Sequence, residues 1–164
     1  GPGIGAVGMC LTGGFALAMA SDERMLAPVL SQPSLPFALI PGRAKDLGLP
    51  QDELVRVQRR TQEDGLCVMG LRFTEDPLVP AKRFKALRDA LGDAFIAIEL
   101  DSSKGNGAGF PLHAHSVLVR EHVPEPGHPS EVARQRVRDF FVSRILRPDP
   151  QARGKGKGRR KRAR

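Results

Sequence analysis

The sequence predicts an α/β fold in which about four parallel strands are flanked by helices. Apolar runs of strand length alternate along the chain with longer stretches that carry a single apolar stripe. Proline, glycine and polar residues separate these stretches. Strands that alternate with helices form a parallel sheet with right-handed crossovers.

The first part of the chain supplies two strands and a helix. Residues 4–9 form an uncharged apolar run that predicts a strand. Small residues at 12–20 predict a short helix that packs closely against it. Residues 25–30 predict the second strand, and the prolines within 31–36 predict a loop.

Two more strands and two helices are expected next. Residues 50–61 predict a helix opened by proline, and the almost wholly apolar residues 66–73 predict a strand buried on both faces. A third helix should begin at Pro80 and stop at Gly92, and residues 94–100 predict the fourth strand. The apolar stripe of the third helix consists of Phe84, Leu87 and Leu91.

The last helix should be capped by Ser130 and followed by a basic tail. We expect one globular unit over residues 1–147 and a disordered tail over 148–164. The last fourteen residues hold eight of the 26 basic residues and no acid, so 18 basic and 18 acidic residues remain in the body. The tail could touch nucleic acid non-specifically, but a specific nucleic-acid partner is not expected because no aromatic residues interleave its charges. The expected apolar face of the last helix consists of Ala133, Val137, Phe140, Phe141 and Ile145.

The two cysteines, Cys10 and Cys67, form no CxxC motif and no set with metal-ligand spacing. Cys67 lies in an apolar run and is expected to be a small buried residue. This cysteine usage favours a reducing, cytoplasmic setting. Neither a signal peptide nor a membrane-spanning helix is expected, because the uncharged residues 1–20 are rich in glycine and give way to charged residues.

Residues 3–8 match the GxGxxG pattern of dinucleotide-binding sites. That pattern binds pyrophosphate only where a strand precedes the first glycine and a helix opens at the last. Only Gly1 and Pro2 precede this match, so nucleotide binding is a weaker hypothesis than the hydrolase and the binding module described below.

Polar groups with complementary chemistry follow three of the predicted strands. Cys10 follows the first strand, Asp76 the third and His115 the fourth. The carboxyl ends of parallel strands meet at one edge of the sheet, where binding and catalytic residues lie in such folds. The chain order of nucleophile, acid and histidine is that of α/β-hydrolases. The residues around Cys10, GMCLTGG, are typical of a nucleophile elbow, a sharp turn between strand and helix.

The elbow, the segment GLRFTEDPLVP and the segment AHSVL together resemble the dienelactone hydrolase family, an α/β-hydrolase branch with a cysteine nucleophile. The resemblance covers about residues 3–146. It implies a partial α/β-hydrolase fold in which the first strands of the family's sheet are missing. It further implies Cys10 as nucleophile, His115 as base, Asp76 as its orienting acid and the Leu11 N–H as an oxyanion donor. A small ester or lactone would be the substrate, with no cofactor or metal.

Alternatives and departures accompany this interpretation. Cys10 could be a core cysteine, Glu75 could replace Asp76, and His113 competes with His115. His122 and His128 are expected at the surface. Thr12 stands where the family usually has glycine.

A second hypothesis is a non-catalytic remnant that binds a partner. Strand 4–9 would have lost one neighbour in the family's sheet, so self-association through its open edge is expected.

Overall fold

The computed structural model describes residues 3–38, 40 and 42–146. The strands are β1 (Ile4–Met9), β2 (Met25–Ser31), β3 (Val68–Phe73) and β4 (Phe95–Leu100). The helices are α1 (Gly13–Met19), α2 (Gln51–Glu63), α3 (Ala81–Leu91) and α4 (Pro129–Phe141). The strands form one four-stranded sheet in the order β1-β2-β3-β4, and every pairing is parallel. The predicted α/β class is therefore confirmed.

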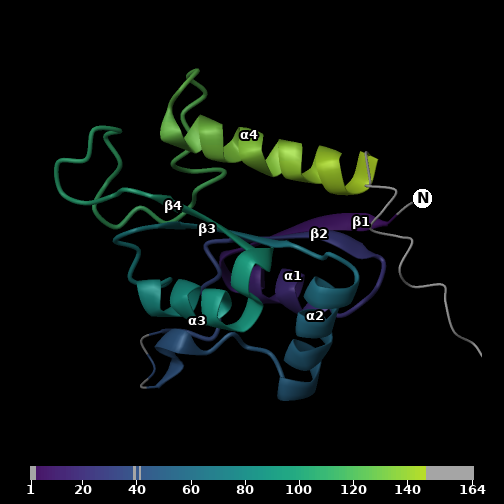
Figure 1. Ribbon diagram of the computed structural model, residues 1–164. Helices are drawn as coiled ribbons and strands as arrows, with labels where there is room; N and C mark the ends of the chain where they lie inside the picture. The colour runs from purple at the N-terminus through teal and green to yellow at the C-terminus, as the bar shows by residue number, and fades with distance from the viewer. Residues whose placement is uncertain (1–2, 39, 41, 147–164) are drawn as a thin grey trace, which may run out of the picture.

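The sheet lies between two layers of helices. Helices α1, α2 and α3 cover one face, and α4 crosses the other (Figure 1). Each of the first three helices joins two adjacent strands, and each crossover steps the same way along the sheet. Right-handed crossovers that step in one direction place their helices on one face, so the opposite face is left for α4.

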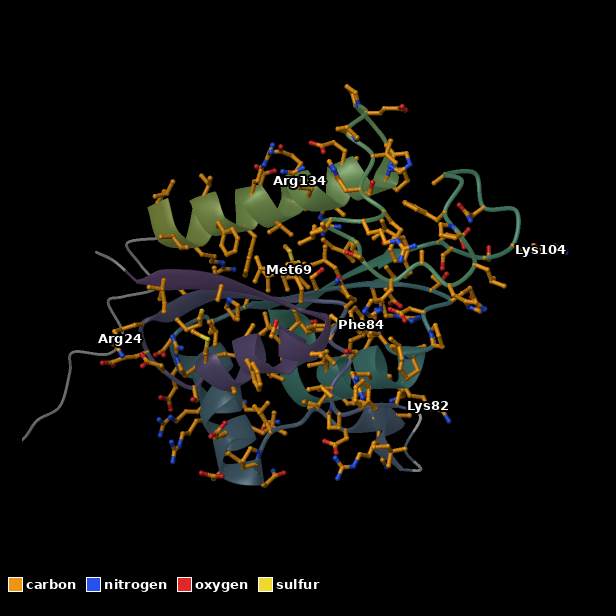
Figure 2. The ribbon with its side chains drawn as sticks, turned by 180° about the vertical axis from the view of Figure 1, so that it is seen from behind. Arg24, Met69, Lys82, Phe84, Lys104 and Arg134 are labelled. Carbon is orange, nitrogen blue, oxygen red and sulfur yellow. The ribbon has the colours of Figure 1, made fainter. Side chains whose placement is uncertain are left out.

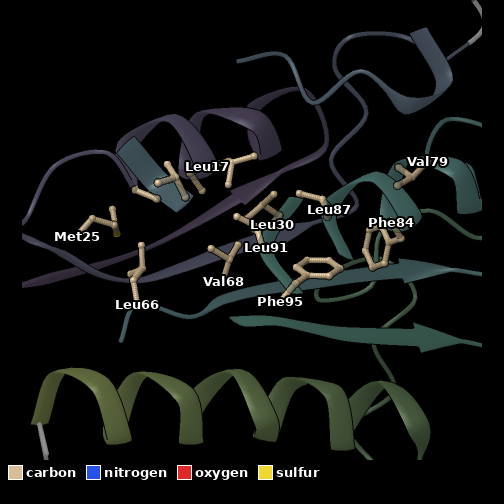
Figure 3. Close-up of a cluster of buried hydrophobic side chains, with 13 residues drawn as sticks. Leu17, Met25, Leu30, Leu66, Val68, Val79, Phe84, Leu87, Leu91 and Phe95 are labelled. Carbon is tan, nitrogen blue, oxygen red and sulfur yellow. The ribbon is translucent and has the colours of Figure 1, made fainter. Parts of the chain in front are cut away.

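The first hydrophobic core fills the space between the sheet and helices α1 to α3 (Figure 3). Phe84 on α3 meets Phe95 on β4 edge to face, with ring centroids 5.4 Å apart. The stripe expected on α3 is confirmed, since Phe84, Leu87 and Leu91 are all buried. The other buried members are Ala16, Leu17, Ala20, Met25, Leu30, Val57, Leu66, Val68 and Val79.

The second core lies between the sheet and α4, together with the loop that precedes α4. In Figure 2, Met69 points from the sheet toward α4, whereas Phe84 lies on the other side. The expected apolar face of α4 is confirmed: Ala133, Val137 and Phe140 are buried, and Phe141 and Ile145 are partly buried against this core. Buried residues of the loop, Phe110, Ala114 and Val117, complete it.

β1 is an edge strand among the described residues, because it pairs with β2 alone. Its side chains Ile4, Val7 and Met9 are each more than a third exposed. Glycines of the GxGxxG match fall inside this strand rather than in a loop before a helix. The match therefore lacks the backbone arrangement that cradles a pyrophosphate.

The strands and helices lie within a few residues of their predicted positions. β3 begins at Val68 rather than at residue 66, because the Leu66 amide still donates to the Arg60 carbonyl at the end of α2. The predicted helix at 12–20 is split: a 3₁₀ turn, Cys10–Thr12, precedes α1.

The prediction that Ser130 caps the last helix is wrong. His128 is the N-cap residue, and its Nδ1 accepts from the Ser130 amide at 3.3 Å. The Ser130 hydroxyl instead accepts from the Val123 amide at 3.0 Å and ties the preceding loop to the helix.

The expectation of surface positions for His122 and His128 is also wrong, since both are half-buried. The His122 ring contacts Glu131 on α4, with 2.5 Å between Nε2 and Oε2, and the His128 ring packs edge to face on Phe110. Cys67 is half-buried rather than buried, and the Arg144 guanidinium lies 2.8 Å from its sulfur.

The basic tail, residues 148–164, lies outside the described residues, so its predicted disorder stays a prediction. Among the described helices, none has the length and hydropathy needed to span a membrane.

Candidate active site at the carboxyl edge of the sheet

Cys10 occupies a strained turn between β1 and α1. Its φ of 53° lies in the left-handed region, which residues with a side chain rarely adopt. Such strain is typical of functional sites that the surrounding fold holds in place. Two glycines allow the turn: a Cβ on Gly8 would lie 2.3 Å from the Thr12 carbonyl oxygen, and one on Gly13 would lie 2.5 Å from the Pro33 Cα.

Thr12 fits the turn despite its branched side chain. Its own backbone, with φ of −89° and ψ of 0°, lies outside the left-handed region. The hydroxyl accepts from the Met9 amide at 3.0 Å and donates to the Met9 carbonyl at 2.9 Å. Thr12 therefore closes the elbow with its side chain. The next residue, Gly13, is the one that tolerates no Cβ, because Pro33 lies too close to it.

The structure brings Cys10, His115 and Asp76 together. The His115 Nε2 lies 3.1 Å from the Cys10 sulfur, and its Nδ1 lies 2.7 Å from the Asp76 Oδ2. The histidine thus bridges the thiol and the carboxylate with its two ring nitrogens. This is the arrangement that nucleophile, base and orienting acid require.

Asp76 is held by the turn that follows β3. Its second oxygen, Oδ1, accepts from the Leu78 amide at 2.9 Å, and its side chain is fully buried. Arg72, buried at the end of β3, donates to the carbonyls of Thr74 and Val79 on either side of Asp76. Asp76 pairs with His115, whereas the competing Glu75 is exposed.

His115 lies in the long loop between β4 and α4. Its neighbours Ala114 and Val117 are fully buried in the second core and fix the loop on either side of the ring. The competing His113 is exposed, and its Nδ1 lies 3.5 Å from the Glu75 carbonyl rather than near the thiol.

The surroundings lower the pKa of the Cys10 thiol and raise the pKa of the His115 imidazole. Burial raises the pKa of Cys10, but hydrogen bonds from Ser34 and His115 outweigh it and lower that pKa below its ordinary value. The hydrogen bond to Asp76 raises the pKa of His115 to about 9, against burial, with the thiol adding to the rise. Both shifts favour a thiolate–imidazolium pair at neutral pH.

Leu11 follows Cys10 at the start of the 3₁₀ turn. A hydrogen bond from its backbone N–H is the smallest of the causes that lower the pKa of Cys10. An amide in that position can also donate to an oxyanion formed on a carbonyl carbon bound to sulfur. The Leu11 side chain lines a cavity of about 310 Å³ beside the elbow. The cavity is also lined by Gly14, Phe15, Leu35, Pro36, Phe37, Ile40, Arg43 and Gly48.

Sequence analysis missed Ser34 and two buried arginines. The Ser34 hydroxyl lies 3.4 Å from the Cys10 sulfur, and its position after β2 was the signal that could have found it. Arg72 and Arg83 are almost fully buried, whereas charged residues are ordinarily assigned to the surface.

In the described part of the chain, no three His, Cys, Asp or Glu side chains lie close enough together to hold a metal ion. Comparison with known proteins found no matching family model, no matching curated protein and no matching solved structure.

Proposed function

We propose that this chain hydrolyses small esters or lactones through Cys10, His115 and Asp76, as a member of the dienelactone hydrolase branch of the α/β-hydrolases. The observation that carries the proposal is the His115 ring, which contacts the Cys10 sulfur and the Asp76 carboxylate through opposite nitrogens. The left-handed backbone of Cys10 and the four parallel strands are compatible with that fold. Leu11 has the role of oxyanion donor.

The first half-reaction acylates the thiol. The Cys10 thiolate attacks the carbonyl carbon, and the carbonyl π electrons move to the oxygen, which accepts from the Leu11 amide. As the tetrahedral intermediate collapses, the carbon–oxygen bond to the leaving alkoxide breaks. His115 gives its Nε2 proton to that alkoxide, so an alcohol leaves and a thioester remains on Cys10. A lactone would open without losing its alcohol.

The second half-reaction restores the enzyme. Neutral His115 removes a proton from water, and the resulting hydroxide adds to the thioester carbon. Collapse of the second intermediate breaks the carbon–sulfur bond and returns the thiolate, while His115 keeps the proton. The acid product loses its own proton to solvent. Asp76 stabilises the imidazolium through its hydrogen bond to the His115 Nδ1.

The cavity beside Leu11 would receive the apolar part of the substrate. Leu35, Phe37 and Ile40 supply aliphatic and aromatic walls. A volume of about 310 Å³ lies at the lower end of the range for small-molecule sites.

Acylation of Cys10 by an activated ester tests this function without requiring rapid turnover. Intact-mass analysis after brief exposure to p-nitrophenyl acetate should show one acyl group, absent from Cys10→Ala and retained in Cys67→Ala. Cys67 is the control thiol because it too is half-buried and free. Equal acylation of both cysteines, or none at Cys10, would contradict the proposal.

A non-catalytic binding module is the alternative, favoured by the open edge of β1 and its exposed apolar side chains. In that case Cys10 would react slowly, as a core cysteine does. We also propose a cytoplasmic setting, on the ground that both cysteines are free thiols.

A further inference from the structure

Ser34 is the second side chain that contacts the candidate nucleophile. Its hydroxyl oxygen lies 3.4 Å from the Cys10 sulfur, and its amide donates to the Cys10 carbonyl at 3.0 Å. The residue is fully buried. Two hydrogen bonds to one residue fix the serine against the elbow, and they reach Cys10 through both its backbone and its side chain.

The direction of the side-chain hydrogen bond follows from the charge on sulfur. His115 already faces the sulfur through Nε2, and its raised pKa keeps a proton on that ring at neutral pH. A thiolate has no proton and can only accept. When Cys10 is a thiolate, the Ser34 hydroxyl therefore donates to it, and the sulfur receives two donors, Ser34 and the His115 ring.

The segment that carries Ser34 is fixed by a buried arginine. Arg83, in the first turn of α3, donates through Nη1 to the Pro33 carbonyl at 2.8 Å and through Nη2 to the carbonyls of Pro36 and Arg43. Its side chain is among the largest that are fully buried. Pro33 also packs on Gly13 so closely that a Cβ would not fit. The Ser34 segment is thus clamped between α3 and the elbow.

We propose that Ser34 is a catalytic residue whose hydroxyl donates to the Cys10 thiolate in the resting enzyme, and that Arg83 is the positioning residue that holds it there. This inference rests on the proposed function of Cys10 as nucleophile. The Ser34 hydrogen bond increases the fraction of thiolate at neutral pH. The same hydrogen bond makes each thiolate less reactive, because the nucleophilicity of a thiolate falls as the pKa of its thiol falls.

Ser34→Ala should therefore raise two measured quantities together. The midpoint of thiolate formation should rise by about 1–2 pH units, the size expected for one hydrogen bond to a charged group. The limiting rate of alkylation above that midpoint should rise about 2.5- to 10-fold, since a more basic thiolate is a better nucleophile. A purely structural role for Ser34 would not produce this paired change.

The experiment measures iodoacetamide alkylation of Cys10 against pH in a Cys67→Ser background, so that a single thiol reports. The matched control is Ser31→Ala, which removes another fully buried hydroxyl, one that contacts Gln32 instead of Cys10. The control should leave the midpoint within error of the parent. Arg83→Lys should raise the midpoint as Ser34→Ala does, and the double variant should add little to either change.

The outcomes separate this inference from the proposed function. An unchanged midpoint in Ser34→Ala, or an equal shift in Ser31→Ala, overturns the role of Ser34 while a low midpoint in the parent still supports Cys10. A parent midpoint near that of a free thiol, about 8.5, overturns the proposed function itself.

Discussion

The Nε2 of His115 lies 3.1 Å from the sulfur of Cys10, although 105 residues separate them in the chain. The contact joins the 3₁₀ turn after the first strand of the sheet to the loop after the last strand. The other ring nitrogen of His115 contacts Asp76. The protonation state of the thiol therefore depends, through His115, on a carboxylate with which the thiol makes no contact.

Asp76→Asn should lower the pKa of His115 from about 9 toward 6.5, because the hydrogen bond to Asp76 is the largest cause of the rise. The imidazole C–H signals of the four histidines can be followed by NMR against pH, with His115→Asn assigning the relevant signal. If His115 titrated at the same low pH in the parent protein as in Asp76→Asn, Asp76 would not be what sets this pKa.

The same raised pKa should make stability depend on pH. His115 binds its proton more tightly folded than unfolded, so its contribution is full below about 6.5 and is lost as pH rises toward about 9. The lowered pKa of Cys10 acts with the opposite sign, so the test uses Cys10→Ser. Over this window the free energy of unfolding should fall by roughly 1–2 kcal/mol, a value reduced for solvent screening, and adding Asp76→Asn should flatten the profile.

Two adjacent glycines should respond oppositely to alanine. A Cβ at Gly13 would lie 2.5 Å from the Pro33 Cα, so Gly13→Ala should cost about 1–3 kcal/mol and slow alkylation of Cys10 by displacing the Ser34 segment. A Cβ at Gly14 would have only the Leu35 carbonyl within 4 Å, at 3.8 Å, so Gly14→Ala should be neutral or stabilising by up to about 1 kcal/mol. Urea unfolding of both variants provides the comparison, and similar losses would contradict the close packing at Gly13.

Arg72 and Arg88 share one carboxylate, Glu99, and should differ sharply in importance. Arg72 is buried and also holds the carbonyls around Asp76, so Arg72→Met should destabilise the protein by about 3–5 kcal/mol. Arg88 is about half exposed, so Arg88→Ala should cost at most about 1 kcal/mol. Thermal unfolding distinguishes the two, and equal shifts in melting temperature would refute the assigned role of Arg72.

The open edge of β1 should lead this 164-residue chain to dimerise or aggregate at tens of micromolar. Val7→Lys should reduce this association, because a charge on an edge strand opposes pairing. Val55→Lys, at an exposed position on α2, is the control and should not reduce it. Chromatography with light scattering measures both, and a sharp monomer peak for the parent would contradict the expectation.

The order and approximate limits of the strands could be predicted because apolar runs and prolines mark them directly. Residues 4–9 match β1 at both ends, and the convergence of Cys10, Asp76 and His115 could be expected from their places after parallel strands. Local patterns mark each strand, and the parallel topology they imply brings the carboxyl ends of the strands to one edge, so one sequence is enough to predict both.

Contacts between distant segments could not be predicted in this way. His128 displaces Ser130 as the cap because its ring is anchored on Phe110. Arg83 is buried because three carbonyls of the loop after β2 converge on it. Neither partner is near in sequence, and composition gives no sign of either.

The loop that carries His115 is fastened to the core beneath α4 through Ala114 and Val117, whereas the helix that follows Cys10 packs into the opposite core through Ala16 and Leu17. The distance between sulfur and imidazole is therefore set by both layers of the protein at once. In a compact state that keeps its helices but loses fixed packing, this spacing would relax and the thiol would regain ordinary acidity. The rate of Cys10 alkylation at mildly acidic pH therefore reports whether the two layers are packed against each other, and its measurement needs no substrate.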